Sequence, residues 1–230
     1  MKKIGIIGGM SIYSTIDYYR LIAEEYNKSQ GGSAFPELII DSLNHGKMAK
    51  LIAADQWDLV LNELVNSANN LINAKAEVII IAANTPHIIF DKLIKKVKVP
   101  MISIMEATGK AIQYKKLKKV GLIGTKSTMD GTYYQKTLNK LGIEIITPEE
   151  EDKKIIDGII KKELIFNVIK EESKKIYIQI MDKLKRAGVE GIILGCTEIP
   201  LLIKEKDYPL PLFDTTTIHA KAVLDYVIKS

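Results

Sequence analysis

The chain has 230 residues, of which 47% are hydrophobic and 27% are charged, and its formal net charge is +5. These proportions are typical of a globular protein with a sizeable core, and no apolar run approaches the length of a membrane span. The positive charge comes mostly from dispersed lysines, since Arg20 and Arg186 are the only arginines. Nucleic-acid binding proteins usually gather arginines and aromatic residues on one face. We therefore expect neither a nucleic-acid partner nor a membrane partner.

Cys196 is the only cysteine, so the chain cannot form an internal disulfide, which favours a reducing cytoplasm. The first residues lead directly into an apolar strand with no signal-peptide cleavage pattern, in agreement with that location. The three histidines, His45, His87 and His219, are scattered, and Cys196 has no second ligand at metal-binding spacing, so we expect no metal site. The turn "GIIGG" lacks the third glycine of a dinucleotide fingerprint, so we expect no cofactor.

Short apolar strands alternate with helix-length segments along the whole chain. The expected strands are 3–7, 37–41, 78–82, 101–104, 120–123, 144–147, 191–194 and a short one near Leu212. The expected helices are 12–27, 57–74, 87–95, 104–114, 128–141, 155–162, 172–187 and 216–228. This alternation favours an α/β fold of parallel sheets with helices on both faces.

An internal repeat divides this pattern into two halves. The stretch "IGIIGG" (4–9) resembles "VGLIGT" (120–125), and "VIIIAANTP" (78–86) resembles "GIILGCTEI" (191–199). The separations nearly agree, since Gly8 precedes Ala83 by 75 residues and Gly124 precedes Cys196 by 72. We expect two pseudo-symmetric α/β domains, 1–103 and 104–213, with the active site in the cleft between them. The last helix, 214–230, is expected to pack back on the first domain.

Small polar side chains follow four of the expected strands. In parallel sheets ligands bind at the carboxyl ends of the strands, where helix N-termini present free N–H groups. The candidate substrate-binding residues are Met10, Ser11, Ala83, Asn84, Thr85, Thr125, Thr128 and Thr197, and the candidate catalytic residue is Cys196. Hydroxyl, amide and N–H groups suit a small carboxylate. The helix field is expected to lower the pKa of the Cys196 thiol and to favour its thiolate.

A second carboxylate on the ligand would need a further cation, and no arginine is well placed to clamp it. The candidate lysines are Lys47 and Lys50, on a loop expected after the second strand, and Lys161 and Lys162 in the second half. For each lysine, a solvated surface position is the alternative. Asp214 either orients a group in the site or caps the last helix.

These motifs resemble the aspartate/glutamate racemase family, the cofactor-independent amino-acid racemases. The stretch "IGIIGGMSIYSTIDYYRLI" is similar to the family's opening strand, turn and helix, and "GLIGTKSTM" to their second-half counterpart. The closing motifs of the family are similar to "GCTEIP" and "FDTTTIHA". The resemblance covers nearly the whole chain. It implies a homodimer of two-domain subunits, an acidic amino acid as substrate, and a reaction without pyridoxal phosphate.

The resemblance also implies a pair of cysteines on opposite sides of the substrate. One thiolate removes the α-proton and the other thiol returns a proton to the opposite face, because a single base would have to change faces. Cys196 matches the second-half cysteine, but the first-half position holds Ala83, whose methyl group transfers no proton. The expected function is racemisation of aspartate, or of glutamate, with water or His87 serving the Ala83 side.

The alanine at this position leaves three alternatives. The same superfamily resembles the arylmalonate decarboxylases. These enzymes need only one cysteine, because loss of carbon dioxide forms the carbanion and only its protonation remains. A second alternative is a catalytically silent binder of acidic amino acids. A third is that Ala83 is an engineered substitution for cysteine.

Overall fold

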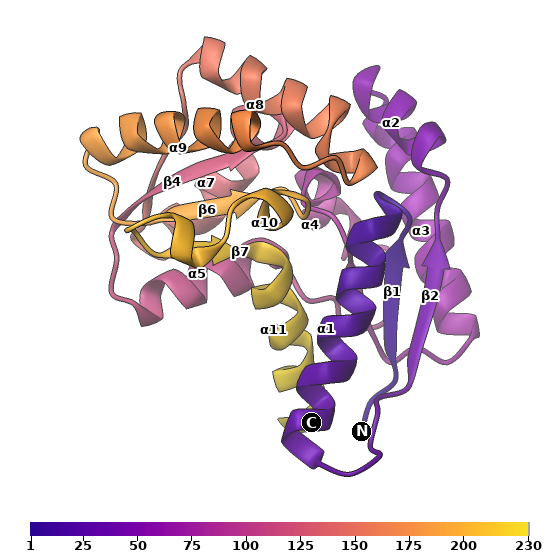
Figure 1. The fold of residues 1–230 in the computed structure, drawn as a ribbon. Helices are drawn as coiled ribbons and strands as arrows, with labels where there is room; N and C mark the ends of the chain where they lie inside the picture. The colour runs from indigo at the N-terminus through magenta and orange to yellow at the C-terminus, as the bar shows by residue number, and fades with distance from the viewer. Residues whose placement is uncertain (230) are drawn as a thin grey trace. The chain divides into compact units, whose positions relative to one another are not determined.

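The computed structural model describes residues 1–229, which divide into two compact units. The first unit contains Met1–Ser103 and the chain from His219 onward, and the second contains Ile104–Ile218. Each unit is a parallel sheet flanked by helices (Figure 1), so the predicted α/β class is confirmed. No helix in the described part of the chain is both long and apolar enough to cross a membrane.

The elements follow one another as the alternating pattern predicts. The first unit contains β1 (Ile4–Gly8), α1 (Ile12–Gln30), β2 (Leu38–Ser42), α2 (His45–Ala53), α3 (Trp57–Asn73), β3 (Val78–Ile81), the 3₁₀ helix η1 (Thr85–Ile89) and α4 (Phe90–Leu93). The second contains α5 (Ile104–Tyr114), β4 (Lys119–Gly124), α6 (Lys126–Asp130), α7 (Thr132–Asn139), β5 (Glu144–Ile146), α8 (Glu150–Lys162), η2 (Leu164–Phe166), α9 (Glu171–Arg186), β6 (Ile192–Gly195), α10 (Ile199–Leu202), η3 (Glu205–Asp207) and β7 (Leu212–Asp214). The last helix, α11 (Thr215–Lys229), begins in the second unit and continues into the first.

The two sheets share one strand order. The first runs β2-β1-β3, and Met101 adds a parallel bridge beside β3. The second runs β5-β4-β6-β7. The aligned pairs are Gly5 with Ile79 in the first sheet and Gly121 with Ile192 in the second. Four residues beyond each isoleucine the chain reaches Ala83 and Cys196, so the register supports the repeat and makes these two positions equivalent.

Alternate strand residues face the two helical layers of each sheet. In the first unit, Ile4 and Ile6 pack with buried side chains of α1 and α11, two helices that lie side by side in Figure 1. Gly5 faces the other layer, where an added Cβ would lie 3.2 Å from Leu71 of α3. In the second unit, Ile123 packs with α8 and α9. Each large apolar side chain buried in this way contributes about 1.5–3 kcal/mol.

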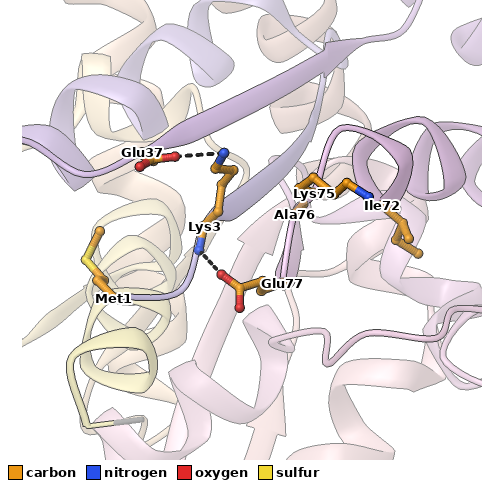
Figure 2. Close-up of a pocket in the computed structure, with 7 residues that line it drawn as sticks. All are labelled: Met1, Lys3, Glu37, Ile72, Lys75, Ala76 and Glu77. Atoms are coloured by element: carbon orange, nitrogen blue, oxygen red, sulfur yellow. Dashed lines mark hydrogen bonds and ion pairs between the residues drawn. The ribbon is translucent and has the colours of Figure 1, made fainter.

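The amino end of the first sheet is held by a group of charged residues that we call the first clasp: Lys3, Glu37 and Glu77. The Lys3 Nζ lies 2.7 Å from Glu37 Oε2, and the Lys3 N–H donates to Glu77 Oε2 at 2.9 Å (Figure 2). The clasp joins the amino ends of all three strands.

The second sheet has an equivalent group, the second clasp, formed by Lys119, Glu144 and Glu190. The Lys119 Nζ lies 3.6 Å from Glu144 Oε1. The N–H groups of Lys118 and Lys119 donate to Glu190 Oε2 at 2.7 and 2.9 Å. The internal repeat therefore extends to the charged residues at the amino ends of the strands, which the glycine motifs alone do not reveal.

The helix expected at 155–162 is α8, which begins earlier, at Glu150, and four other expected elements differ from the structure in kind. The segment 101–104 forms one bridge only, because α5 begins at Ile104. The expected helix 128–141 is divided into α6 and α7 at Gly131, whose ψ of 133° is extended. The expected helix 87–95 is the 3₁₀ turn η1 followed by α4. The segment after β2 is helix α2, not a loop, and begins where the Asn44 side chain accepts the Lys47 N–H.

Candidate active site

The predicted site residues form two groups, one at the carboxyl end of each sheet. The first-unit group, which follows β1 and β3, consists of Met10, Ser11, Ala83, Asn84 and Thr85. The second-unit group, which follows β4 and β6, consists of Thr125, Thr128, Cys196 and Thr197. Within each unit the two strands are hydrogen-bonded neighbours, so the residues that follow them are brought together.

A buried thiol and a buried carboxylate lie in contact at the end of β6. The Cys196 Sγ donates to Glu198 Oε2 at 2.9 Å, and the Thr197 hydroxyl donates to the same oxygen at 2.9 Å. Cys196 is 7% exposed and Glu198 is 4% exposed. Glu198 was not among the predicted site residues, although it stands in the "GCTE" motif two residues after the cysteine. The pair can pass a proton between sulfur and oxygen.

The thiol of this pair is protonated in the resting protein. Burial raises the pKa of Cys196 well above its usual range, and the Glu198 carboxylate raises it further. The Glu198 N–H lowers it, as expected at the start of a helix, but this effect is smaller. The expectation of a lowered thiol pKa is therefore wrong. It considered the helix field of α10, which has only four residues, and left out burial and the neighbouring carboxylate.

Three hydroxyl groups form a chain beyond β4. The Thr125 Oγ1 accepts the Thr128 N–H at 3.3 Å and lies 3.0 Å from Thr128 Oγ1, which accepts the Tyr133 hydroxyl at 3.1 Å. Thr128 is fully buried. Its methyl carbon would lie 3.2 Å from a Cβ added to Gly124 or Gly195, so two glycines give it room against the strand ends. Sequence reasoning missed Tyr133, which no motif marks.

Asp157 of α8 brings one candidate lysine to the same end of β4. Its Oδ1 accepts the Lys126 N–H at 2.9 Å, and its Oδ2 lies 2.7 Å from Lys161 Nζ. Lys47 pairs instead with Glu63 at 2.7 Å. All four candidate lysines are exposed, and no ion pair is recorded for Lys50 or Lys162. The sequence offers no sign of Asp157, because its position depends on how α8 packs on the sheet.

Asp214 caps the last helix, which is one of the two roles that the sequence predicts for it. Its Oδ1 accepts the Thr216 N–H at 3.0 Å, and its Oδ2 accepts the Thr217 hydroxyl at 2.7 Å. The Thr215 hydroxyl donates to Leu194 O at 2.9 Å, which joins the start of α11 to β6.

In the first unit, the turn after β1 is tied to the end of β3. The Ser11 Oγ caps α1 by accepting the Ser14 N–H at 3.3 Å, and the Ser14 hydroxyl donates to Ala82 O at 2.9 Å. Gly9 has a φ of 81°, and a Cβ at this position would lie 2.1 Å from Leu43 O. The turn therefore requires glycine.

The Ala83 turn is held by a neutral imidazole. His87 Nδ1 donates to Ala83 O at 2.9 Å, and the ring stacks on Phe90 with 5.0 Å between centroids. Burial lowers the pKa of His87 to about 3, and His219 nearby lowers it too. His87 thus shapes the turn and is a poor proton donor at neutral pH.

The second buried imidazole, His219, uses both of its ring nitrogens. Tyr18 donates to Nδ1 at 2.8 Å, and Nε2 donates to Ile102 O at 2.9 Å. Burial lowers the pKa of His219 to about 4. These contacts make it a structural residue.

A cavity of about 500 Å³ lies at the amino end of the first sheet (Figure 2), whereas the predicted site residues of that unit follow the carboxyl ends of its strands. Its lining residues are Met1, Lys3, Glu37, Ile72, Lys75, Ala76 and Glu77. Three of them form the first clasp, so their charged groups already pair with one another and with the backbone at the amino ends of the strands. Within residues 1–229, no three His, Cys, Asp or Glu residues gather to hold a metal ion.

The family of Asp/Glu/hydantoin racemases matches residues 7–223, so the chain belongs to this family, as the motifs indicate. A proposed Asp/Glu racemase from Yersinia pestis is 40% identical, with a TM-score of 0.92 over 99% of this chain and 100% of that one. An aspartate racemase homologue from Pyrococcus horikoshii is 38% identical, with a TM-score of 0.84 over the whole of both chains. A broad specificity amino-acid racemase from Bacillus subtilis is 23% identical over 96% of each chain.

Proposed function

We propose that this protein is an amino-acid racemase that acts on aspartate, and on glutamate as the second candidate, by proton transfer through Cys196 without pyridoxal phosphate. The observation that carries the proposal is the buried contact of 2.9 Å between Cys196 Sγ and Glu198 Oε2. Family membership supports the reaction class. The similarity to an aspartate racemase homologue supports the acidic substrate.

In the proposed mechanism, Glu198 takes the proton of the Cys196 thiol. The thiolate then removes the α-proton of the amino acid, forming an S–H bond and a carbanion that the α-carboxylate stabilises. A proton delivered to the opposite face completes the inversion. In the reverse direction the thiol gives its proton to the carbanion, and Glu198 returns a proton to the sulfur.

Water is the proton carrier that we propose for the Ala83 side. Ala83 itself carries no acid or base, and the neutral His87 donates its Nδ1 proton to Ala83 O. Of the two carriers expected from the sequence, water and His87, the hydrogen bond and the low pKa of His87 favour water.

We propose that the remaining candidate residues bind the substrate. Backbone N–H groups near Asn84–Thr85 and Cys196–Thr197 would hold the α-carboxylate, and Met10 and Ala83 would line the site. Ser11, Thr125 and Lys161 would hold the second carboxylate, with the buried Thr128 behind Thr125. Lys161 is preferred to the other lysines because Asp157 ties it to the residue next to Thr125.

The test is incubation with each enantiomer of aspartate and glutamate in heavy water, following α-proton exchange and inversion separately. We expect both for the preferred substrate in the wild-type protein, and neither in Cys196→Ser. Exchange without inversion would show a one-sided site. The absence of both, in protein that still binds the substrate, would contradict the racemase proposal and favour a silent binder.

Ala83 favours one second candidate, a decarboxylase with a single cysteine. In such an enzyme the arylmalonate substrate would lose carbon dioxide, which leaves a carbanion. One proton donor is then enough, and the protonated Cys196 would supply that proton. Release of carbon dioxide from phenylmalonate, without exchange of either amino acid, would support this candidate over the racemase.

We also propose that the enzyme works as a cytoplasmic homodimer with no cofactor. The single cysteine supports the location, the absence of a dinucleotide fingerprint in the sequence supports a reaction without a cofactor, and the homodimer rests on the family resemblance. Sedimentation at equilibrium should give twice the chain mass, and the purified active protein should show no cofactor absorbance and keep its activity with chelators.

A further inference from the structure

The helix α1 carries exposed apolar side chains on a second side. Its sheet-facing side is buried through Ser14, Thr15, Tyr18 and Ile22. Ile12, Ile16 and Tyr19, which we call the α1 row, follow one another at spacings of four and three residues and so share another side of the helix. They are 58%, 57% and 52% exposed. A surface helix normally turns charged or polar residues to the solvent, so an apolar row there indicates a covering partner.

The α1 row lies on the flank of the helix that faces β2. The opposite flank faces α11, because Tyr18 donates to His219 of α11 at 2.8 Å. His219 in turn donates to Ile102 O at 2.9 Å, and Ile102 follows the residue that bridges to β3. Tyr19 comes about 100° after Tyr18 around the helix, with the buried Ile22 between them. Figure 1 shows the same arrangement, with α11 and β2 on opposite sides of α1.

An exposed side chain of β2 extends the row onto the sheet. β2 is the edge strand of the first sheet, and Ile40 is aligned with Ile6 of β1. Side chains of aligned residues in neighbouring strands point to the same face. Because Ile6 packs with α1 and α11, Ile40 points to the α1 side, where it is 39% exposed. We call the α1 row together with Ile40 the α1 patch.

The composition of α1 is that of an interface. Residues 12–27 contain no lysine, although lysine supplies nearly all the positive charge of the chain. They contain four of its ten tyrosines, and Arg20 is one of its two arginines. The cores of protein–protein interfaces are enriched in tyrosine and arginine and depleted in lysine. This helix therefore differs from the lysine-rich surface of the rest of the chain in the direction that an interface requires.

A row of charged residues runs beside the α1 patch. Arg20 lies 3.2 Å from Asp17 Oδ1 and 3.1 Å from Glu24 Oε2. In an antiparallel pair of α1 helices centred between Ile16 and Tyr19, Ile16 of one copy faces Tyr19 of the other. Arg20 of each copy then comes within reach of Asp17 of the other, and no like charges are opposed. The surface is complementary to itself, as a two-fold interface requires.

The size of the α1 patch suits a dimer of this kind. A whole apolar side chain of this size exposes roughly 150–200 Å², so the exposed parts of the four side chains amount to roughly 300–400 Å². Each partner buries about 800 Å² in a standard interface, and somewhat more than half of that area is apolar. The α1 patch supplies most of the apolar share, and the charged row beside it supplies a polar rim.

We propose that the α1 patch binds a second copy of this chain, with two α1 helices packed antiparallel about a two-fold axis. The inference rests on the homodimer of the proposed function and deepens it, because it names the surface that joins the two subunits.

The test is sedimentation at equilibrium of wild type and Ile16→Glu over a range of protein concentrations. The variant places a carboxylate against the apolar side chains of the other copy, twice in each dimer. The Kd of the dimer should therefore rise about 100-fold or more. Helix content and melting temperature should stay near those of wild type, because Ile16 is 57% exposed within one chain.

Leu59→Glu is the matched control. Leu59 is 48% exposed on α3, a helix whose Leu71 packs on the other face of the first sheet. The control adds the same charge at a similarly exposed position outside the α1 patch. Its dimer Kd should stay within about twofold of wild type.

Two charge reversals test the antiparallel arrangement. Asp17→Arg places like charges within reach of each other across the interface and should raise the dimer Kd about 5- to 10-fold. Adding Arg20→Asp restores opposite charges and should bring Kd back to within about twofold of wild type. A double variant that dimerises no better than Asp17→Arg would contradict the antiparallel packing.

The outcomes separate the two proposals. If Ile16→Glu dimerises as well as wild type, or if Leu59→Glu dissociates to the same extent, the α1 patch is not the interface, while the homodimer stands. Tyr19→Ala, expected to raise Kd about 10-fold or more, replaces Ile16→Glu if that variant does not fold. If wild type is a monomer at every concentration, the homodimer and this inference both fail, and proton exchange in heavy water still tests the racemase.

Discussion

The carboxyl ends of the two sheets have equivalent backbone positions and different chemistry. In the second unit the turn reads Cys196–Thr197–Glu198, and in the first it reads Ala83–Asn84–Thr85. The second turn holds a thiol and a carboxylate 2.9 Å apart, whereas the first is fixed by a neutral imidazole on Ala83 O. A repeated fold therefore supplies two similar frameworks, and only one of them carries groups that exchange a proton.

The amino ends of the sheets differ much less from each other. The first and second clasps place a lysine and two glutamates at the same three positions. Charges that hold strands together are thus present in both halves, while the reactive pair is present in one. This contrast can be tested at each of the four sheet ends.

The largest effect should follow from removing the reactive thiol. Cys196→Ser should reduce α-proton exchange about 10³-fold or more, because an alcohol is a far weaker acid than a thiol and forms its anion only at high pH. Succinate affinity, measured by calorimetry, should change little. An exchange rate near that of wild type would rule out Cys196 as the proton carrier.

Glu198→Gln should have the next largest effect. The amide cannot take the thiol proton, so exchange should fall about 10- to 100-fold. Without the carboxylate charge, the pKa of Cys196 should also fall, since Glu198 raises it in the wild type. Because Cys196 is the only cysteine, thiolate absorbance during a pH titration reports it alone.

Thr197→Val is the control for this change, because it removes one hydrogen bond to Glu198 and keeps the charge. Its thiol should titrate close to that of wild type. A thiol pKa that rises in Glu198→Gln would contradict the electrostatic account.

The buried histidines of the first unit should make the protein sensitive to acid. Their folded pKa values of about 3 for His87 and about 4 for His219 lie below the usual 6.5, so the unfolded chain binds protons first. The stabilisation from these two neutral histidines is present above about pH 6.5 and is lost as the pH falls toward 4 for His219 and toward 3 for His87. Between pH 7 and pH 5, the free energy of unfolding in urea should drop by about 2–4 kcal/mol.

Variants can assign this loss to the buried pair. His219→Phe should remove about half of the pH dependence, in addition to its cost at pH 7 from the broken bonds to Tyr18 and Ile102. His45→Gln, at an exposed position on α2, should leave the slope unchanged. A flat profile in wild type between pH 7 and pH 5 would show that neither buried histidine is kept neutral by the fold.

The clasps should give the smallest effect. Glu190 accepts two N–H groups, which lower its pKa, so its contribution is present at neutral pH and fades in acid. Glu190→Gln should lower the melting temperature by about 1–2 °C, because the group is exposed to solvent. Glu77→Gln, where one N–H is accepted, should shift it less. A larger effect at Glu77 would show that the clasps are not equivalent.

The fold was predictable because hydrophobic runs and turns repeat along the chain. Seven strands were found within about two residues, since buried parallel strands read as short apolar runs. The helix α2 was missed although Met48, Leu51 and Ile52 recur at helical spacing, because it has only nine residues and only Met48 is buried. The break at Gly131 was missed because both flanking helices present helix-like patterns, and the kink serves the Tyr133 ring.

The positions of the candidate site residues were easier to anticipate than their chemistry. The rule that ligands bind at carboxyl ends of strands selected Cys196 and Thr125 from the sequence. The protonation of Cys196 was not predictable in the same way, because it depends on the burial of the thiol and on the direction in which Glu198 turns. Asp157 and Tyr133 reach the strand ends from α8 and α7, and such placements depend on packing.

In the proposed mechanism the first unit lacks the thiol that Cys196 provides in the second, and Ala83→Cys supplies it. Inversion and exchange of aspartate and glutamate in heavy water should be measured side by side for wild type and for this variant. General acid–base groups contribute about 10²- to 10⁴-fold, so inversion should rise by a factor in this range while exchange through Cys196 changes far less. A folded variant that binds succinate and shows no gain in inversion would contradict the account.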